Sequence, residues 1–165
     1  MPELLYPKIS IVTACFNAEK TLEQTIQSVI DQRYPNLEYI VIDGGSNDQS
    51  VDIIKKYENS LAYWSSSKDA GQYDAINKGM AKASGEVLGW LNADDMLLPR
   101  SLFTVGEIFS QLTNVEWVST LKPGSWDTNG SLAKIDSLPG FSKTAFMDGL
   151  FLPTVAKRGY WMQQE

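Results

Sequence analysis

Three clusters of polar residues follow three apolar segments of the chain, and they contain the residue types best suited to binding or catalysis. The clusters span residues 13–17, 43–48 and 92–95. In an open α/β sheet, ligands bind beyond the carboxyl ends of the strands. If the apolar segments are strands of one parallel sheet, the three clusters predict a single binding site at its edge.

The third cluster contains two adjacent carboxylates, Asp94 and Asp95. Neighbouring like charges in a cleft repel each other unless a cation is present, and oxygen ligands of this type suit Mg2+ or Mn2+. An ion there would bridge a diphosphate and neutralise the charge that develops as a nucleoside diphosphate leaves. The alternative is a solvated acidic cluster that caps the helix expected after Pro99.

The second cluster begins with Asp43, which directly follows the apolar residues 39–42. At the end of a strand its carboxylate could accept a hydrogen bond from the N–H of a nucleobase, although an Asp that caps a turn is the commoner case for a single residue. The following residues, 44–48, have neither a GxGxxG fingerprint nor a Walker lysine. The joint placement of the three clusters is what favours a functional interpretation.

Residues 68–79 combine polar side chains with glycines at the start of a predicted helix. Backbone N–H groups and Lys78 could meet anionic oxygens there; the alternative is an ordinary helix start in which Asp74 complements the helix dipole. Trp64, Tyr73 and Trp90 could stack on a sugar or base, but aromatic residues in predicted strands are more often core, and we assign Trp90 to the core.

The elements that would position these residues alternate regularly between strands and helices. Apolar segments predict strands at residues 8–14, 37–43, 61–67, 86–92 and near 115–120. Helical spacing of apolar residues predicts helices over 19–33, around 51–57, through 76–83 and through 102–109. The alternation predicts an α/β fold: one mostly parallel sheet with right-handed crossovers and helices on both faces.

Composition restricts the function further. A chain of 165 residues fits one domain, and its net charge of −6 without Lys/Arg clusters argues against binding to nucleic acid. The chain has no histidine, so carboxylates must supply any acid–base or metal chemistry. The single cysteine, Cys15, and the lack of a signal peptide or an apolar stretch of ~20 residues lead us to expect a cytoplasmic protein without a membrane span.

The motifs together resemble those of the family 2 glycosyltransferases, which are inverting enzymes with the GT-A (Rossmann-like) fold. The resemblance covers about residues 8–99. It is carried, in family order, by ISIVTACFN, SVIDQRYPNLEYIVIDGGSNDQS, DAGQYDAINKG and ASGEVLGWLNADDMLLP. It implies transfer of a sugar from a nucleoside-diphosphate donor, UDP-linked by resemblance, to an acceptor hydroxyl.

Carried over residue by residue, the resemblance assigns roles to six positions. The backbone from Ala14 to Phe16 and the side chain of Asp43 would hold the nucleobase. Asp94 would meet the ribose, and Asp95 would be the principal ligand of Mn2+ or Mg2+ in a DxD-type motif. Asn92 stands at the first position of that motif, and Ala14 stands where many relatives have proline; both changes leave the metal-binding carboxylate in place.

The resemblance also implies an acceptor-binding region with a carboxylate base, and family members usually continue well past the length of this chain to provide it. We expect a nucleotide-sugar-binding region over residues 1–120 and a partial, loop-rich acceptor-side region over residues 121–165. An inverting transfer needs a base within hydrogen-bond reach of the acceptor hydroxyl. The candidates are Asp127, Asp136, Asp148 and Glu165, of which Glu165 is favoured because it follows a predicted strand.

Two other functional interpretations stay open. One is a non-catalytic or truncated nucleotide-sugar-binding module that lacks a competent base. The other is a Rossmann-type oxidoreductase, although the first strand-to-helix turn lacks the glycine fingerprint of that class. The partners implied by the family resemblance are a nucleotide-sugar donor and a saccharide or glycolipid acceptor. The resemblance also implies that the protein takes part in polysaccharide assembly at the inner face of a bacterial membrane and associates peripherally with that membrane.

Overall fold

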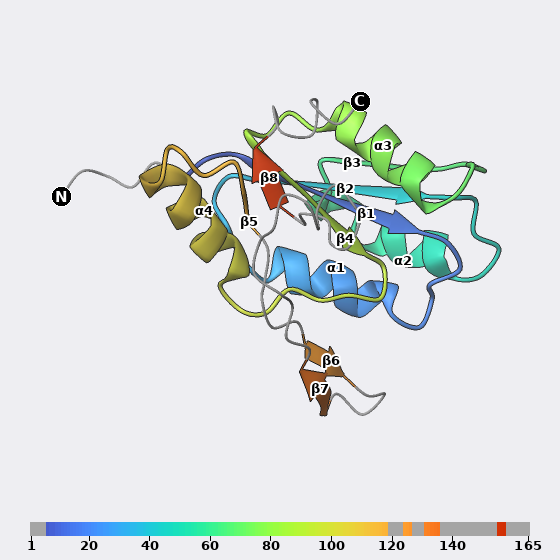
Figure 1. The fold of residues 1–165 in the computed structure, drawn as a ribbon. Coiled ribbons are helices and arrows are strands. Elements are labelled where there is room, and N and C mark those ends of the chain that lie inside the picture. The colour runs from blue at the N-terminus through green and yellow to red at the C-terminus, as the bar shows by residue number, and fades with distance from the viewer. Residues whose placement is uncertain (1–5, 119–123, 127–130, 136–154, 158–165) are drawn as a thin grey trace, which may run out of the picture.

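A computed structural model describes residues 6–118, 124–126, 131–135 and 155–157 of the chain. Its centre is a six-stranded sheet with the order β3-β2-β1-β4-β8-β5 (Figure 1). The strands of this sheet are β1 (Ile9–Cys15), β2 (Leu37–Asp43), β3 (Tyr63–Ser66), β4 (Val87–Asn92), β5 (Trp117–Val118) and β8 (Val155–Lys157). The first four are parallel to one another, and β8 is antiparallel to both β4 and β5. The mostly parallel sheet predicted from the sequence is confirmed.

Helices cover both faces of this sheet. They are α1 (Leu22–Ile30), α2 (Ser50–Lys56), a 3-10 helix (Glu58–Ser60), α3 (Gln72–Lys82) and α4 (Ser101–Gln111). Figure 1 shows α3 on one side of the sheet and α1 and α2 on the other. Two further strands, β6 (Gly124–Trp126) and β7 (Leu132–Ile135), pair into a separate small sheet.

The alternation of side chains along the strands explains the two layers. On one face, Ile11 of β1 and Val41 of β2 belong to a core that also contains apolar residues of α1, α2 and α4. On the other face, Val12 and Ile42 pack with residues of α3 in a second core. All seven residues of β1 are buried, as expected for a central strand of a sheet covered on both sides.

Three elements differ in length from the sequence-based expectation. The first helix begins at Leu22, not at residue 19, because residues 18–21 form the turn that leads into it. The third strand is confined to Tyr63–Ser66. The third helix ends at Lys82, because Ala83 has an extended backbone and the next residues turn toward β4.

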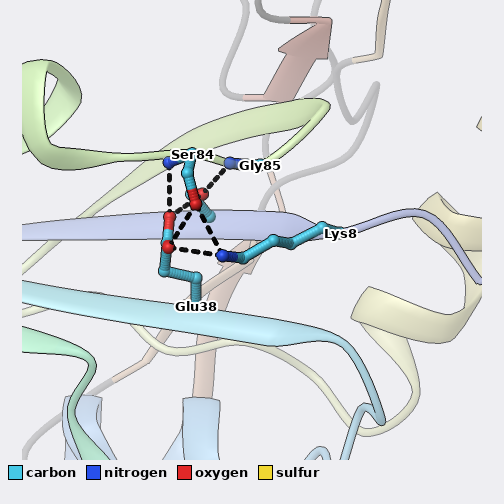
Figure 2. A network of polar contacts seen from close by, with 5 residues as sticks. Lys8, Glu38, Ser84 and Gly85 are labelled. Atoms are coloured by element: carbon cyan, nitrogen blue, oxygen red, sulfur yellow. Dashed lines mark hydrogen bonds and ion pairs between the residues drawn. The ribbon is translucent and has the colours of Figure 1, made fainter.

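A polar network at the amino ends of the strands fixes that turn (Figure 2). Glu38, at the start of β2, accepts hydrogen bonds from Lys8 Nζ (2.6 Å), Ser10 Oγ (2.5 Å) and the backbone N–H of Ser84 (2.6 Å). Ser10 Oγ also accepts the N–H of Gly85 at 2.8 Å. Burial would raise the pKa of Glu38, but these hydrogen bonds outweigh it and lower that pKa to about 2.

Candidate functional site

The three polar clusters predicted to meet do so at the carboxyl ends of β1, β2 and β4. The register pairs Cys15 with Asp43 across β1 and β2, and Ala14 with Asn92 across β1 and β4. The chain crosses from β1 to β2 on one side and later to β4 on the other, so β1 lies where the strand order reverses. Ligands of open α/β sheets bind at such a switch point.

A cavity of about 640 Å3 opens at this point. Its walls come from the end of β1, from the first residue after β2, from the loop between β3 and α3, and from residues 92–94. The size lies in the range that is usual for small-molecule sites. Ala14 and Phe16, both assigned to the nucleobase, line the cavity, and the Phe16 side chain is 64% exposed.

Side-chain hydrogen bonds lock the loops after β1 and β2 together. Asn17, in the left-handed region with a φ of 50°, accepts the N–H of Asn47 at 3.0 Å through Oδ1, and its own N–H donates to Ser46 Oγ at 2.8 Å. The N–H of Gly44 donates to the carbonyl of Cys15 at 2.8 Å. The wall formed by these two loops is therefore held in place before any ligand binds.

Cys15 also lines the cavity but is buried. Burial raises the pKa of its thiol to about 12. Since the thiolate is the reactive form of cysteine, this side chain is unsuited to act as a nucleophile.

The Asp43 carboxylate is fully buried beneath the turn that follows β2. Oδ2 accepts the N–H groups of Gly45 (3.1 Å) and Ser46 (3.0 Å) and the hydroxyl of Ser66 (2.6 Å), and Oδ1 accepts the hydroxyl of Ser46. Asp43 is not among the residues that line the cavity. Its contact with a nucleobase stays a prediction, while its structural part in shaping the turn is clear.

The loop between β3 and α3 and the first residue of α3 contribute cavity residues that the sequence analysis did not single out: Lys68 and Asp69 of the loop, and Gln72 of the helix. They lie within the polar segment 68–79, in which Lys78 was the residue predicted to meet anionic oxygens. Lys78 lies further along α3, where its Nζ pairs with Asp74 Oδ2 at 2.8 Å. Position beyond the carboxyl end of a strand was the signal that could have identified the loop residues.

The acidic pair follows β4 after one residue, Ala93, and a chain of amides holds one member of the pair. Gln72 Nε2 donates to Asn92 Oδ1 at 2.6 Å, and Asn92 Nδ2 donates to Asp95 Oδ2 at 2.9 Å. The next residue after Asn92 is Ala93, whose carbonyl accepts a hydrogen bond from Thr25 Oγ1 of α1 at 2.9 Å. These contacts fix the loop of the predicted metal motif on two helices.

The electrostatics of the pair suit a cation. Asp95 is not among the residues that line the cavity, and its side chain is largely exposed. The pKa of Asp95 is raised, first by the partial burial of its carboxyl group and second because Asp94 is next to it; the hydrogen bond from Asn92 acts in the opposite direction. A cation would relieve both effects. No group of three or more acidic or thiol side chains that could enclose a metal occurs in the described residues. Mg2+ commonly binds through one or two carboxylates plus substrate phosphates, which matches this pair.

The remaining predicted residues have the following positions. Trp64 is partly buried and packs against the core that contains Ile11 and Val41. Trp90 is partly buried and packs against the second core, as expected from the sequence, whereas Tyr73 is 68% exposed. Glu165 lies outside the described residues, as do the other base candidates, Asp127, Asp136 and Asp148. In the described part of the chain, no helix is long and apolar enough to cross a membrane.

Comparisons with known proteins agree with this architecture. The model of the family described as "Glycosyl transferase family 2" matches residues 10–152. An uncharacterised glycosyltransferase of Mycobacterium tuberculosis is 46% identical over 90 residues, which are 54% of this chain and 34% of that protein. The chain thus spans about a third of the length of this relative.

Solved structures show the same fold. Residues 1–349 of TarS from S. aureus superpose with a TM-score of 0.69 at 18% identity, over 95% of this chain and 49% of that one. A further TarS structure, a complex with UDP-GlcNAc, superposes with a TM-score of 0.60 at 21% identity, over 87% of this chain and 47% of that one. A mannosyltransferase from Pyrobaculum calidifontis, in complex with GDP-Man and Mn2+, superposes with a TM-score of 0.63 at 23% identity, over 74% of this chain and 38% of that one. At these identities the likeness concerns the fold alone.

Proposed function

Since the chain belongs to glycosyl transferase family 2, we propose that its cavity binds a nucleoside-diphosphate sugar, with UDP as the favoured carrier, for transfer to an acceptor hydroxyl. The observation that carries the proposal is the position of the acidic pair: Asp94 lines a cavity at the switch point of the sheet, and the amide of Asn92 holds Asp95 beside it. The nucleotide complexes of fold neighbours support the choice of ligand class.

In this proposal each wall of the cavity meets one part of the donor. The end of β1, with Ala14 and Phe16, lies against the nucleobase, and Asp94 meets the ribose. Asp95, with its raised pKa, is the carboxylate whose charge needs a partner, and it would hold Mn2+ or Mg2+ together with the donor phosphates. When bound, the ion supplies Lewis-acid stabilisation of the leaving diphosphate. Lys78, paired with Asp74, would have to exchange that partner to reach an anionic oxygen.

The transfer itself is an inverting displacement. The acceptor oxygen forms a bond to C1 of the sugar from the face opposite the diphosphate, while the bond from C1 to the phosphate oxygen breaks and its electron pair stays on the nucleoside diphosphate. The acceptor proton passes to a carboxylate base within hydrogen-bond reach. Glu165 remains the candidate for that base, and its test is the loss of turnover with retained donor binding in Glu165→Gln.

The test of the binding site is a calorimetric titration with UDP, with and without Mn2+. We expect Mn2+ to strengthen binding by the wild type. The Asp95→Ala variant should lose more than about 100-fold of that Mn2+-dependent affinity, since replacing residues that merely support metal ligands already costs about 10–100-fold. Asp31→Ala is the matched control: it removes one carboxylate at the far end of α1 from the site.

The outcomes separate clearly. Mn2+-dependent binding that is lost in Asp95→Ala and kept in Asp31→Ala supports the proposal. If the wild type binds neither UDP nor any other nucleoside diphosphate, the donor-site proposal is refuted. Donor binding without transfer or hydrolysis by the 165-residue chain would favour a nucleotide-sugar-binding module.

A further inference from the structure

We propose that two hydroxyl side chains of α1, Thr25 and Ser28, are positioning residues for the acidic pair: they hold the backbone on either side of Asp94 and Asp95, and so fix where the Asp95 carboxylate meets a divalent ion. This inference rests on the proposed function. Thr25 and Ser28 are not among the residues that line the cavity. Each would therefore act through the acidic pair and not by touching the donor.

The acidic pair belongs to a segment, residues 93–100, that contains neither helix nor strand. Figure 1 shows this segment, between β4 and α4, passing along α1. Backbone N–H and C=O groups that are withdrawn from water need hydrogen-bond partners, and a segment without regular structure cannot supply them from a ladder of its own. Side chains of α1 are the nearest alternative partners.

Thr25 and Ser28 supply two of these partners. Thr25 Oγ1 donates to the carbonyl of Ala93 at 2.9 Å, which is shorter than its contact of 3.4 Å with the carbonyl of Thr21 in the preceding turn. Ser28 Oγ accepts the N–H of Leu97 at 3.1 Å and donates to the carbonyl of Thr25 at 2.8 Å. Residues three apart in a helix lie on the same face, so both hydroxyls are directed to the same segment.

A third polar side chain continues this face just beyond the end of α1. Gln32 is only 8% exposed, and its Nε2 donates to the carbonyls of Leu98 and Ser28, each at 3.0 Å. The segment is thus held at residues 93, 97 and 98. Between the first two of these positions lie only residues 94–96, which are exposed. The acidic pair therefore occupies a three-residue bridge, residues 94–96, whose two ends are fixed by α1.

This arrangement bears on metal affinity through conformational entropy. A bridge that is fixed at both ends has few conformations, so its carboxylates need little further ordering when an ion binds. Losing either hydroxyl would add conformations in which Asp95 does not reach the ion. Replacing groups that hold metal ligands in place commonly lowers metal affinity by about 10- to 100-fold. The alternative is that the two hydroxyls stabilise the fold and have no particular effect on the metal site.

The test uses the Mn2+ enhancement, defined as the ratio of the UDP affinity with Mn2+ to the UDP affinity without it, both measured by calorimetry. Ser28→Ala should lower this ratio about 10-fold, with little change in the affinity measured without metal. Ser10→Ala is the matched control: Ser10 is a buried serine at the amino end of β1, and its Oγ also accepts a backbone N–H, that of Gly85, at 2.8 Å. It should lower the free energy of unfolding and leave the Mn2+ enhancement unchanged.

Two substitutions of Thr25 separate its hydroxyl from its packing. Thr25 is fully buried. Valine keeps the shape of the side chain but cannot donate to Ala93, so Thr25→Val should lower the Mn2+ enhancement about 10-fold. Serine keeps the hydroxyl and loses only the methyl group, so Thr25→Ser should retain most of the enhancement. Urea unfolding of each variant shows whether it is folded under the conditions of the titration.

The results distinguish this inference from the proposed function. A wild type that binds no nucleoside diphosphate, or that binds UDP equally with and without Mn2+, refutes the proposed metal-dependent donor site and this inference with it. A wild type with a clear Mn2+ enhancement that Ser28→Ala and Thr25→Val both retain refutes the positioning role alone and leaves the donor site intact. An enhancement that Ser10→Ala loses to the same extent, or that Thr25→Ser loses as fully as Thr25→Val, also refutes the positioning role, because the hydroxyls would then act through the fold.

Discussion

The polar network around Glu38 makes the stability of the fold depend on pH in a way that one substitution can isolate. Glu38 accepts hydrogen bonds from Lys8, Ser10 and Ser84 at the amino ends of β1 and β2. Its side chain is 12% exposed. In Glu38→Gln the side chain keeps its size but no longer titrates, so the variant removes this one contribution to the pH dependence.

The magnitude follows from the pKa of Glu38. That pKa falls from 4.5 to about 2 in the folded protein, and one pKa unit corresponds to about 1.4 kcal/mol, which gives roughly 3 kcal/mol. Lys8 is 36% exposed, so water and salt screen its part. We therefore expect about 2–3 kcal/mol of pH-dependent stability from Glu38.

The sign is fixed by the direction of the shift. A carboxyl group with a lowered pKa in the folded state stabilises that state at pH values above its unfolded pKa, here 4.5. The stabilisation decreases as the pH falls from about 4.5 toward about 2, because Glu38 becomes protonated in the unfolded chain first. Above pH 6 the contribution is complete and constant.

The assay is urea unfolding of the wild type and of Glu38→Gln at several pH values between 7 and 2. Other groups titrate equally in both proteins, so the difference between the two free energies of unfolding reports Glu38 alone. That difference should shrink by about 2–3 kcal/mol between pH 6 and pH 2, equivalent to about 4–12 °C in melting temperature for a domain of this size. Parallel pH profiles for the two proteins would refute the reasoning, because Glu38 would then have the same pKa folded and unfolded.

Two further predictions concern the packing of α3 and the support of the acidic pair. Gly79 of α3 lies so close to Val12 of β1 that an added Cβ would overlap the valine side chain. Although alanine has a better helix propensity than glycine, Gly79→Ala should therefore lower the free energy of unfolding, measured in urea, by about 1–3 kcal/mol. An unchanged or higher free energy of unfolding would contradict this packing. Asn92→Ala removes the amide that joins Gln72 to Asp95. In titrations with UDP, the affinity measured with Mn2+ should fall about 10-fold, while the affinity measured without metal changes little. An equal loss of affinity with and without Mn2+ would show that Asn92 acts through the fold and not through Asp95.

Much of the fold was predictable because its strands and helices have distinct apolar patterns. The continuous apolar runs of β1 and β2 predicted central parallel strands, and both are buried on the two faces of the sheet. The spacing of Leu22, Ile26 and Val29 predicted α1, and these side chains are buried in the core. The third helix was predicted through residue 83 and ends at Lys82, because the turn before β4 is determined by contacts with Ser10 and Glu38, which are distant in sequence.

Antiparallel β8 was not foreseen, for a related reason. It is only three residues long, and the apolar periodicity on which strand prediction depends needs a longer segment. Its place beside β4 comes from pairing between residues more than sixty positions apart in the chain. Neither local propensity nor spacing contains that information, so a strand contributed by the predicted acceptor-side region could be found only in the folded sheet.

The site shows the same limit at the level of single side chains. Turn position alone predicted that residues 13–17, 43–48 and 92–95 would meet, and the register places their strand ends side by side. It could not predict which carboxylate faces the cavity, because that depends on the number of hydrogen bonds each one accepts. Asp43 accepts four and turns inward, whereas Asp69 accepts one and lines the cavity, in a space that only the lack of a side chain on Gly44 leaves open. A glycine at the end of a strand can therefore be as informative about a binding site as an acidic residue, since it shows where a side chain from another loop is accommodated.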